Sequence, residues 1–244
     1  MHGFGIVGVF SNQADVQYLN QVDITVKVVS YGMDFLAYQQ GYLSLKKLGL
    51  LDNLKSLCFI NDSVWFLQKQ QDTVIRAIKK STNNSELFVG AMIADEVPHC
   101  SGWLFALPVN QGTTHELDKL LSPNFARKSK DYNIRIGEHK ILHTIVSVSR
   151  ISQLESFEAM MPYPYCYKAL AEGLECFYLK SDATFRVGAT NMSLEKFIAI
   201  NCIDEEERMQ LIQWLSRRAS SLLLGKKSKI TEMSLYQRRY FNRQ

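Results

Sequence analysis

The feature that most limits the possible folds is the alternation of short apolar runs with helical patterns along the N-terminal half. Residues 4–10 and 24–29 are apolar and end at polar turns, which is typical of buried strands. Residues 34–48 then carry aromatic and leucine side chains at helical spacing, and residues 57–60 form a third apolar run. Strands separated by helices predict an α/β protein with a mostly parallel sheet and helices on its faces.

The rest of the chain is predicted to continue this pattern and then to become helical. The periodicity predicts strands over 87–90 and 103–107 and helices over about 70–80, 115–121, 162–174 and 204–224. No internal repeat or Gly/Ser-rich linker divides the chain. We therefore expect one main domain over residues 1–200, followed by a C-terminal helix and a basic tail over residues 201–244.

Composition limits the class of protein without naming an activity. A chain with 46% hydrophobic and 21% charged residues can bury a full core, which excludes a disordered chain. It has no apolar stretch of about 18 residues and no basic region at its start, so we expect neither a membrane-spanning helix nor a signal peptide. Five cysteines without a CxxC pair predict reduced thiols. These features together favour a soluble, cytoplasmic protein.

The largest charge asymmetry lies in the tail. Residues 216–244 hold eight Lys or Arg against one acidic residue, with leucine, tyrosine and phenylalanine among them. Such a segment could rest on anionic lipid at the inner face of the plasma membrane, or it could be a solvated extension. Nucleic acid is not expected as a partner, because the net charge is only +4 and no binding module is visible.

Two polar turns follow predicted strands, at residues 30–34 and 61–63. Ligands of open α/β sheets bind outside the carboxyl ends of the strands. The carboxylate of Asp62 is a hard oxygen ligand that suits Mg²⁺ or Mn²⁺ holding a diphosphate. The alternative is that Asp62 only caps a turn, as Asp often does.

Several ordered motifs resemble the rhamnan synthesis protein F family of bacterial glycosyltransferases. The resemblance covers about residues 5–185 and rests on the following segments: Val-Phe-Ser-Asn at 9–12, Val-Val-Ser-Tyr-Gly-Met-Asp-Phe-Leu-Ala-Tyr at 28–38, Phe-Ile-Asn-Asp-Ser-Val-Trp at 59–65, His-Cys-Ser-Gly-Trp-Leu-Phe at 99–105, and Met-Pro-Tyr-Pro-Tyr at 161–165 through Phe-Tyr-Leu-Lys at 177–180. This resemblance implies a GT-A-like, Rossmann-related fold that transfers a sugar, such as rhamnose or another deoxysugar, from a nucleotide sugar to a polysaccharide or lipid-linked glycan.

The resemblance also implies which residues would bind the donor. Asp62 would bind the metal and the diphosphate, with Asn61 and Ser63 beside it. Gly32 and Asp34 would shape the turn next to the donor.

On the acceptor side, the resemblance implies a base and two contacts. Glu138 would be the general base that deprotonates the acceptor hydroxyl, because a neutral sugar hydroxyl is a poor nucleophile. His99 and Trp103 would line the acceptor site. Without the family, Glu138 could equally be the acidic start of a helix, and His99 could be a structural histidine in a loop.

The chain departs from the family pattern in ways that leave a second function open. Its start corresponds to the second strand of a GT-A sheet, so the fold is expected to be N-terminally shortened. The segment at 61–63 has one carboxylate instead of two, which leaves metal dependence open. The alternative function is therefore a catalytically inactive, glycosyltransferase-like subunit that binds a glycan or scaffolds a polysaccharide-synthesis complex.

Overall fold

The computed structural model describes residues 4–11, 21–28, 34–61, 63–84, 87–93, 99–122, 137, 153–156, 165–176, 178–180 and 191–226. The chain forms two compact units, and each is described by itself. The first contains residues 1–62 and 72–163, and the second contains residues 63–71 and 164–244. Residue 200 lies inside the second unit, so this division differs from the boundary expected after that residue.

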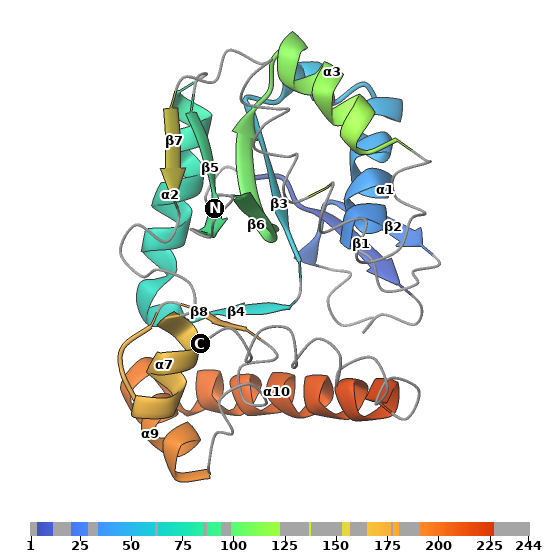
Figure 1. Ribbon diagram of the computed structural model, residues 1–244. Helices are drawn as coiled ribbons and strands as arrows, with labels where there is room; N and C mark the ends of the chain where they lie inside the picture. Colours follow the sequence, from blue (N-terminus) through green and yellow to red (C-terminus); the bar gives the residue numbers. More distant parts are fainter. Residues whose placement is uncertain are drawn as a thin grey trace, which may run out of the picture. The chain divides into compact units, whose positions relative to one another are not determined.

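A four-stranded sheet forms the centre of the first unit (Figure 1). Its order is β3 (Ser56–Ile60), β6 (His99–Pro108), β5 (Leu87–Ile93) and β7 (Gln153–Ser156). Strands β3 and β5 are both antiparallel to β6, and only β7 runs parallel to its neighbour β5. The expectation of a mostly parallel sheet is therefore wrong for these strands. The physical reason is the short connection from β5 to β6, which can only return the chain antiparallel.

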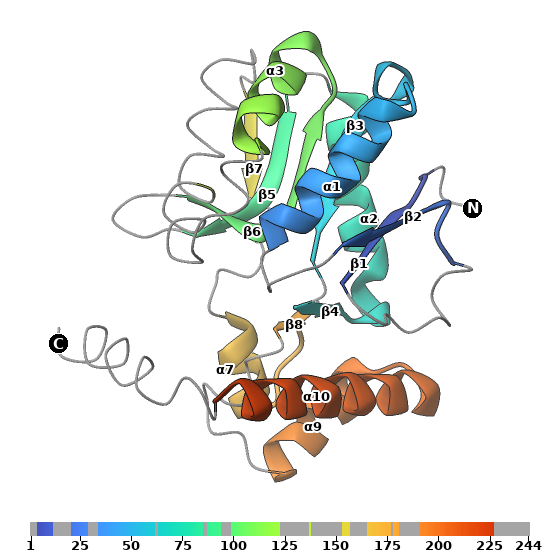
Figure 2. The ribbon, with the colours of Figure 1, turned by 90° about the vertical axis from the view of Figure 1, so that its right-hand side faces the viewer.

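Helices flank this sheet on both faces. Helices α1 (Asp34–Lys47) and α3 (Gln111–Leu120) share a core with one face, to which Phe59 and Phe105 contribute. Helix α2 (Gln71–Asn83) meets the other face (Figure 2). The hydroxyls of Ser56 in β3 and Thr82 in α2 lie 2.7 Å apart. The first unit is thus a mixed α/β layer structure, as the alternating sequence pattern predicted in coarse form.

A separate pair of parallel strands, β1 (Val7–Ser11) and β2 (Ile24–Val28), packs beside α1. Gly41 of α1 allows this close approach. A Cβ atom at that position would lie 3.0 Å from Cγ2 of Val9, which is tighter than ordinary packing distance. A small residue is therefore required where the helix passes over β1.

Local capping sets where the helices begin and end. Helix α3 begins four residues before the predicted start, because the side chain of Asn110 accepts a hydrogen bond from the Thr113 amide at 2.9 Å. Helix α1 ends at Lys47, and Gly49 in the following turn has a φ of 66°, before the chain continues into η2 (Leu51–Asn53).

The second unit is smaller and mainly helical. It contains β4 (Val64–Phe66), η3 (Gln68–Gln70), α7 (Tyr165–Glu172), β8 (Tyr178–Lys180), α9 (Asn191–Asn201) and α10 (Glu205–Lys226). Strands β4 and β8 pair antiparallel, and Phe197, Leu211 and Tyr178 are fully buried. Within the described ranges, no helix is both long and apolar enough to cross a membrane.

Two buried polar side chains connect distant segments of this unit. The Asn201 amide donates to the carbonyls of Leu174 and Phe197, each at 2.9 Å, and its oxygen accepts from the Cys176 amide at 2.7 Å. The Glu207 carboxylate accepts from the amide of Gln68 at 2.6 Å and from that of Ile203 at 2.9 Å. The contact with Gln68 explains why residues 63–71 group with the C-terminal helices.

Candidate functional site

Three of the segments singled out in the sequence meet where β3 finishes, at one end of the strands of the four-stranded sheet. We call this end of the strands the edge of the site. The Asn61 amide, directly after β3, donates to the carbonyl of Trp103 at 3.2 Å. The Tyr38 hydroxyl of α1 donates to the carbonyl of Gly102 at 2.7 Å, and the Tyr38 ring lies 5.2 Å from the ring of Phe59. Segments some 20 to 60 residues apart are therefore held together by backbone and side-chain contacts, all within the first unit.

Helix α1 runs so that its N-terminus lies at this same edge. Tyr38, near its start, contacts β6 at Gly102, whereas Lys46, near its end, forms an ion pair with Asp118 of α3 at 2.8 Å. Figures 1 and 2 show the start of the helix labelled α1 at the end of the sheet where β3 finishes. The carboxyl end of β3, the start of β6 and the N-terminus of a helix consequently share one edge, where a helix dipole favours negative charge.

The part of this edge next to Asn61 is open to solvent. Ile60 is 45% exposed although it closes a strand whose Leu57 and Phe59 are buried. Asn61 itself is half-buried. The position directly after β3 is therefore partly accessible to solvent.

The donor-site residues are only partly described. Asn61 belongs to the first unit and Ser63, which lies in the turn before β4, belongs to the second. Asp34 is the first residue of α1. Gly32, Asp62 and the side chain of Asp34 lie outside the described residues, so their predicted contacts with a donor remain predictions.

The acceptor-side residues are placed less favourably. Trp103 is only 2% exposed, so its ring lies in the core and offers no face to a carbohydrate. His99 is the first residue of β6, opposite Ile93, and its side chain lies outside the described residues, as does Glu138. The structure therefore brings Trp103 to the predicted edge through its backbone alone.

The raised pKa of the cysteine in β3 argues against a thiol nucleophile near the site. Burial raises the pKa of Cys58 to about 12, so this thiol stays protonated near neutral pH. Further along α1, burial and hydrogen bonding to Asp118 raise the pKa of Tyr42 above its ordinary range. Neither group is available as a base or nucleophile.

A metal centre is not evident in the described part of the chain. Within the described ranges, no three His, Cys, Asp or Glu side chains lie together as a metal site would require. Asp62, the predicted ligand, falls outside those ranges. Its described neighbours Asn61 and Ser63 are neutral oxygen donors, which are compatible with Mg²⁺ or Mn²⁺ only as companions of a carboxylate.

Tyr38 is a site-forming residue to which the sequence analysis assigned no role of its own. A tyrosine on the apolar face of a helix was the available signal, because a buried hydroxyl needs a hydrogen-bond partner.

Comparisons with family models, with curated proteins and with solved structures found no match to this chain.

Proposed function

We propose that the chain is a GT-A-type glycosyltransferase, which moves a sugar such as rhamnose or another deoxysugar from a nucleotide-sugar donor to a polysaccharide or lipid-linked glycan. The observation that supports this proposal is the convergence at one sheet edge of Asn61, the start of α1 and the beginning of β6. These three segments carry the motifs that resemble the rhamnan synthesis protein F family. Their separation along the chain makes such a meeting informative.

The donor would bind with its diphosphate at this edge. Asp62 follows Asn61 directly, and the N-terminus of α1 offers backbone amides and a partial positive charge to an anion. As the family resemblance implies, Asn61 and Ser63 would bind the donor beside Asp62, and Gly32 and Asp34 would shape the turn before α1. This set of groups suits a charged, hydroxyl-rich ligand.

A divalent cation would be held by Asp62 together with the diphosphate. The oxygen donors around it are of the kind that Mg²⁺ and Mn²⁺ prefer, and the cation would neutralise charge on the leaving diphosphate. With a single carboxylate in the segment at 61–63, most of the remaining ligands would come from the donor and from water.

Glu138 would act as the general base, and His99 would orient the acceptor. The carboxylate of Glu138 would take the proton from the acceptor hydroxyl while that oxygen attacks the anomeric carbon and the nucleoside diphosphate leaves. His99, at the start of β6, would donate to a sugar hydroxyl. Trp103 has no role in this proposal, because its ring is enclosed.

The first prediction concerns donor binding. Replacing Asp62→Asn removes the carboxylate, and we expect at least a tenfold loss of affinity for the nucleoside diphosphate that binds best to the unmodified protein. A panel of nucleoside diphosphates with and without Mn²⁺, read by thermal shift, identifies that ligand, which should stabilise by about 2.7 kcal/mol at 100 times its Kd. Titration calorimetry then compares the affinities of the variants for that ligand.

Asp52→Asn is the matched control, because Asp52 is exposed in η2 before the other end of β3. Equal affinities in the two variants would contradict the donor site.

The second prediction separates chemistry from binding. Glu138→Gln keeps the size of the side chain but removes the base, so sugar transfer should fall by about 10²–10⁴-fold while donor affinity stays within twofold. Transfer is measured as release of nucleoside diphosphate in the presence of acceptor. Full turnover in this variant would exclude Glu138 as the base.

The same assays distinguish the alternative function. An inactive glycan-binding or scaffolding subunit would bind oligosaccharide but none of the nucleoside diphosphates, and neither substitution would alter its binding.

We further propose that the basic tail contacts anionic lipid, which would bring the protein to lipid-linked acceptors at the inner face of the plasma membrane. Deletion after Ser220 should then reduce sedimentation with vesicles that contain phosphatidylglycerol.

A further inference from the structure

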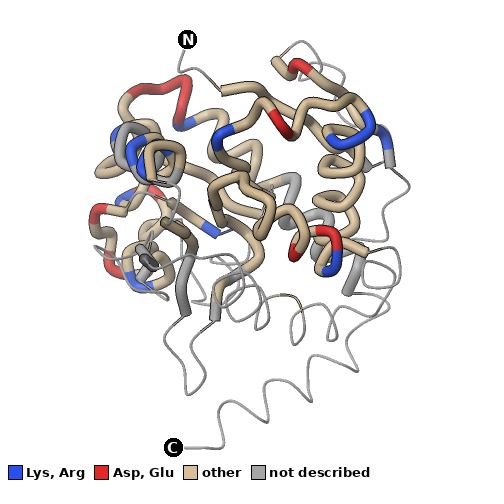
Figure 3. Tube along the Cα trace, turned by 90° about the horizontal axis from the view of Figure 1, so that it is seen from above, with Lys and Arg blue, Asp and Glu red and all other residues tan. Residues whose placement is uncertain are grey.

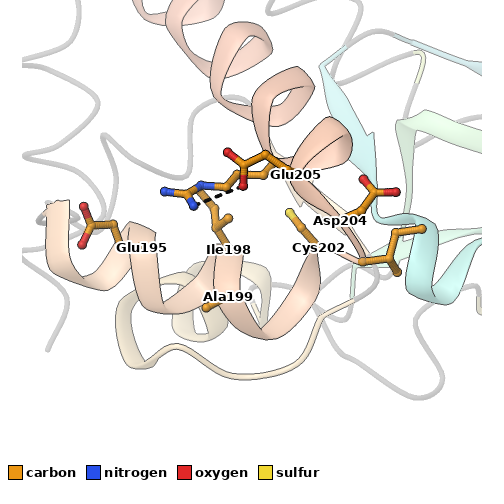
Figure 4. A pocket seen from close by; sticks show the side chains of 8 residues that line it. Glu195, Ile198, Ala199, Cys202, Asp204 and Glu205 are labelled. Carbon is orange, nitrogen blue, oxygen red and sulfur yellow. Dashed lines mark hydrogen bonds and ion pairs between the residues drawn. The ribbon is translucent and has the colours of Figure 1, made fainter.

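Helices α9 and α10 of the second unit border an open pocket of about 370 Å³ (Figure 4). Its apolar lining includes Ile198, Cys202 and Ile203, and Ile203 is 56% exposed. We call this pocket the α9–α10 groove. An exposed isoleucine beside an open groove is a surface that a partly apolar segment could cover.

Carboxylates dominate the rim of the α9–α10 groove. Glu195, Asp204 and Glu205 line it together with one cation, Arg208, which pairs with Glu205 at 3.3 Å. Asp204 accepts from the Glu207 amide and so caps α10. Among the described residues, the exposed carboxylate of Glu195 has no hydrogen-bond or ion-pair partner. The groove therefore has an apolar floor and a net negative rim.

The sequence that follows α10 has the complementary character. Residues 227–244, which lie outside the described residues, include Arg238, Arg239 and Arg243, with Tyr240 and Phe241 between them. Along the described chain, Figure 3 shows Lys and Arg interspersed with Asp and Glu. The tail belongs to the same unit as the groove and matches its acidic rim and apolar floor.

Chain length decides which part of the tail can reach the groove. Helix α10 has 22 residues, so its two ends lie about 33 Å apart, and the groove is at its beginning. The three residues from Lys226 to Lys229 span at most about 11 Å, whereas the twelve from Lys226 to Arg238 span about 40 Å. The lysines next to α10 cannot reach the groove, and the arginines from 238 onward can.

We propose that residues 238–243 bind back into the α9–α10 groove of the same chain, with their arginines at Glu195 and Glu205 and their aromatic rings on the exposed Ile203. The pair of Glu205 with Arg208 is solvent-exposed and therefore weak, so an incoming arginine can share the carboxylate. Tethering supplies an effective concentration in the millimolar range, at which weak contacts suffice. A docked tail is withheld from anionic surfaces, which makes the groove a regulator of any membrane contact.

The native thiol of Cys202 provides a direct test in the full-length chain. Asn242→Cys places a second thiol in the proposed binding segment, and Ser228→Cys places one just after α10 as a matched control. A short bis-maleimide at mildly alkaline pH should link Asn242→Cys to Cys202, identified by peptide mapping, and should leave Ser228→Cys unlinked to Cys202. Burial raises the pKa of Cys202 to about 11, which slows both variants equally.

Charge reversal shows whether the groove recruits the tail. In the Asn242→Cys background, Glu195→Lys with Glu205→Lys, or Arg238→Glu with Arg239→Glu, should each slow linking by about tenfold, and combining all four should restore it. The tail reversal leaves α9 and α10 unchanged, so loss of folding cannot explain its effect. Unchanged linking after either reversal, or links only between two separate chains, would overturn the proposal.

Discussion

In the first unit the rings of Phe59 and Phe105 stack with centroids 4.7 Å apart, and Phe88 continues the stack at 6.3 Å from Phe105. In the second unit two buried polar side chains, Asn201 and Glu207, make five hydrogen bonds to backbone groups of connecting segments. Apolar packing is non-directional and depends on volume, whereas a buried carboxylate depends on the position of each donor. Within the described residues the second unit has two short strands, and its buried side chains supply partners for backbone groups outside them, as Gln39 and Thr113 do for the carbonyls of Leu121 and Pro108 in the first unit.

This difference can be measured separately in the two units because the three tryptophans divide between them. Trp103 lies in the first unit, and Trp65 and Trp214 lie 5.7 Å apart in the second. Urea unfolding followed by fluorescence in a Trp103→Phe background reports on the second unit alone. A Trp65→Phe/Trp214→Phe background reports on the first.

The largest effect is expected from Phe105→Ala. This ring is fully buried between two others, so its removal should lower the free energy of unfolding of the first unit by about 4 kcal/mol. Phe105→Leu, which keeps most of the volume, should cost roughly a third of that. A loss below about 1 kcal/mol for Phe105→Ala would show that the stacked rings are not the centre of this core.

Glu207→Ala should have the next largest effect, in the second unit. Its carboxylate is 0% exposed, and its loss leaves the amides of Gln68 and Ile203 without their acceptor, which should cost about 3 kcal/mol. Glu206→Ala is the control, because this neighbour is exposed and should change the free energy by less than about 0.5 kcal/mol. Similar losses in the two variants would mean that the acidic first turn, and not the two hydrogen bonds, stabilises the unit.

The smallest effects are expected from alanine substitutions at two glycines that share one backbone conformation, one in each unit. Gly49 and Gly173 each have a φ of 66°, so replacement by alanine should cost about 1 kcal/mol from backbone strain alone. A Cβ at Gly49 meets nothing within 4 Å, but one at Gly173 would lie 2.6 Å from the Lys196 side chain, whose amine donates to the Glu172 carbonyl. Gly173→Ala should therefore cost a few tenths of a kcal/mol more than Gly49→Ala. The reverse order would show that Lys196 moves aside freely.

The elements with regular apolar spacing could be predicted from the sequence, and the short ones could not. Strands β1, β2 and β3 and helices α1 and α2 appear close to their predicted bounds. Strands β4, β7 and β8 have only three or four residues, too few to show an alternation. Helix α9 was also missed, although Leu194, Phe197 and Ile198 have the i, i+3, i+4 spacing of an amphipathic face.

The segments that form the candidate site could be predicted from the sequence, but the burial of their side chains could not. Spacing and resemblance selected the segments that contain Tyr38, Asn61 and Trp103, and these do meet. Sequence alternation shows which side chains share a face of a strand, but not how deeply a face is covered, so the burial of Trp103 could not be foreseen. The direction of β6 was also missed, because the strands predicted over 87–90 and 103–107 lie twelve residues apart, whereas β5 and β6 are separated by only five residues.

The discontinuous composition of the second unit has a consequence during synthesis. Strand β4 leaves the ribosome about 110 residues before its partner β8. At translation rates of about 5–20 residues per second, it waits roughly 6–20 s with an unsatisfied edge. The nascent polypeptide therefore has time to complete the β3–β6–β5 sheet before its C-terminal helices can assemble, and chaperones have a defined interval in which to shield that edge.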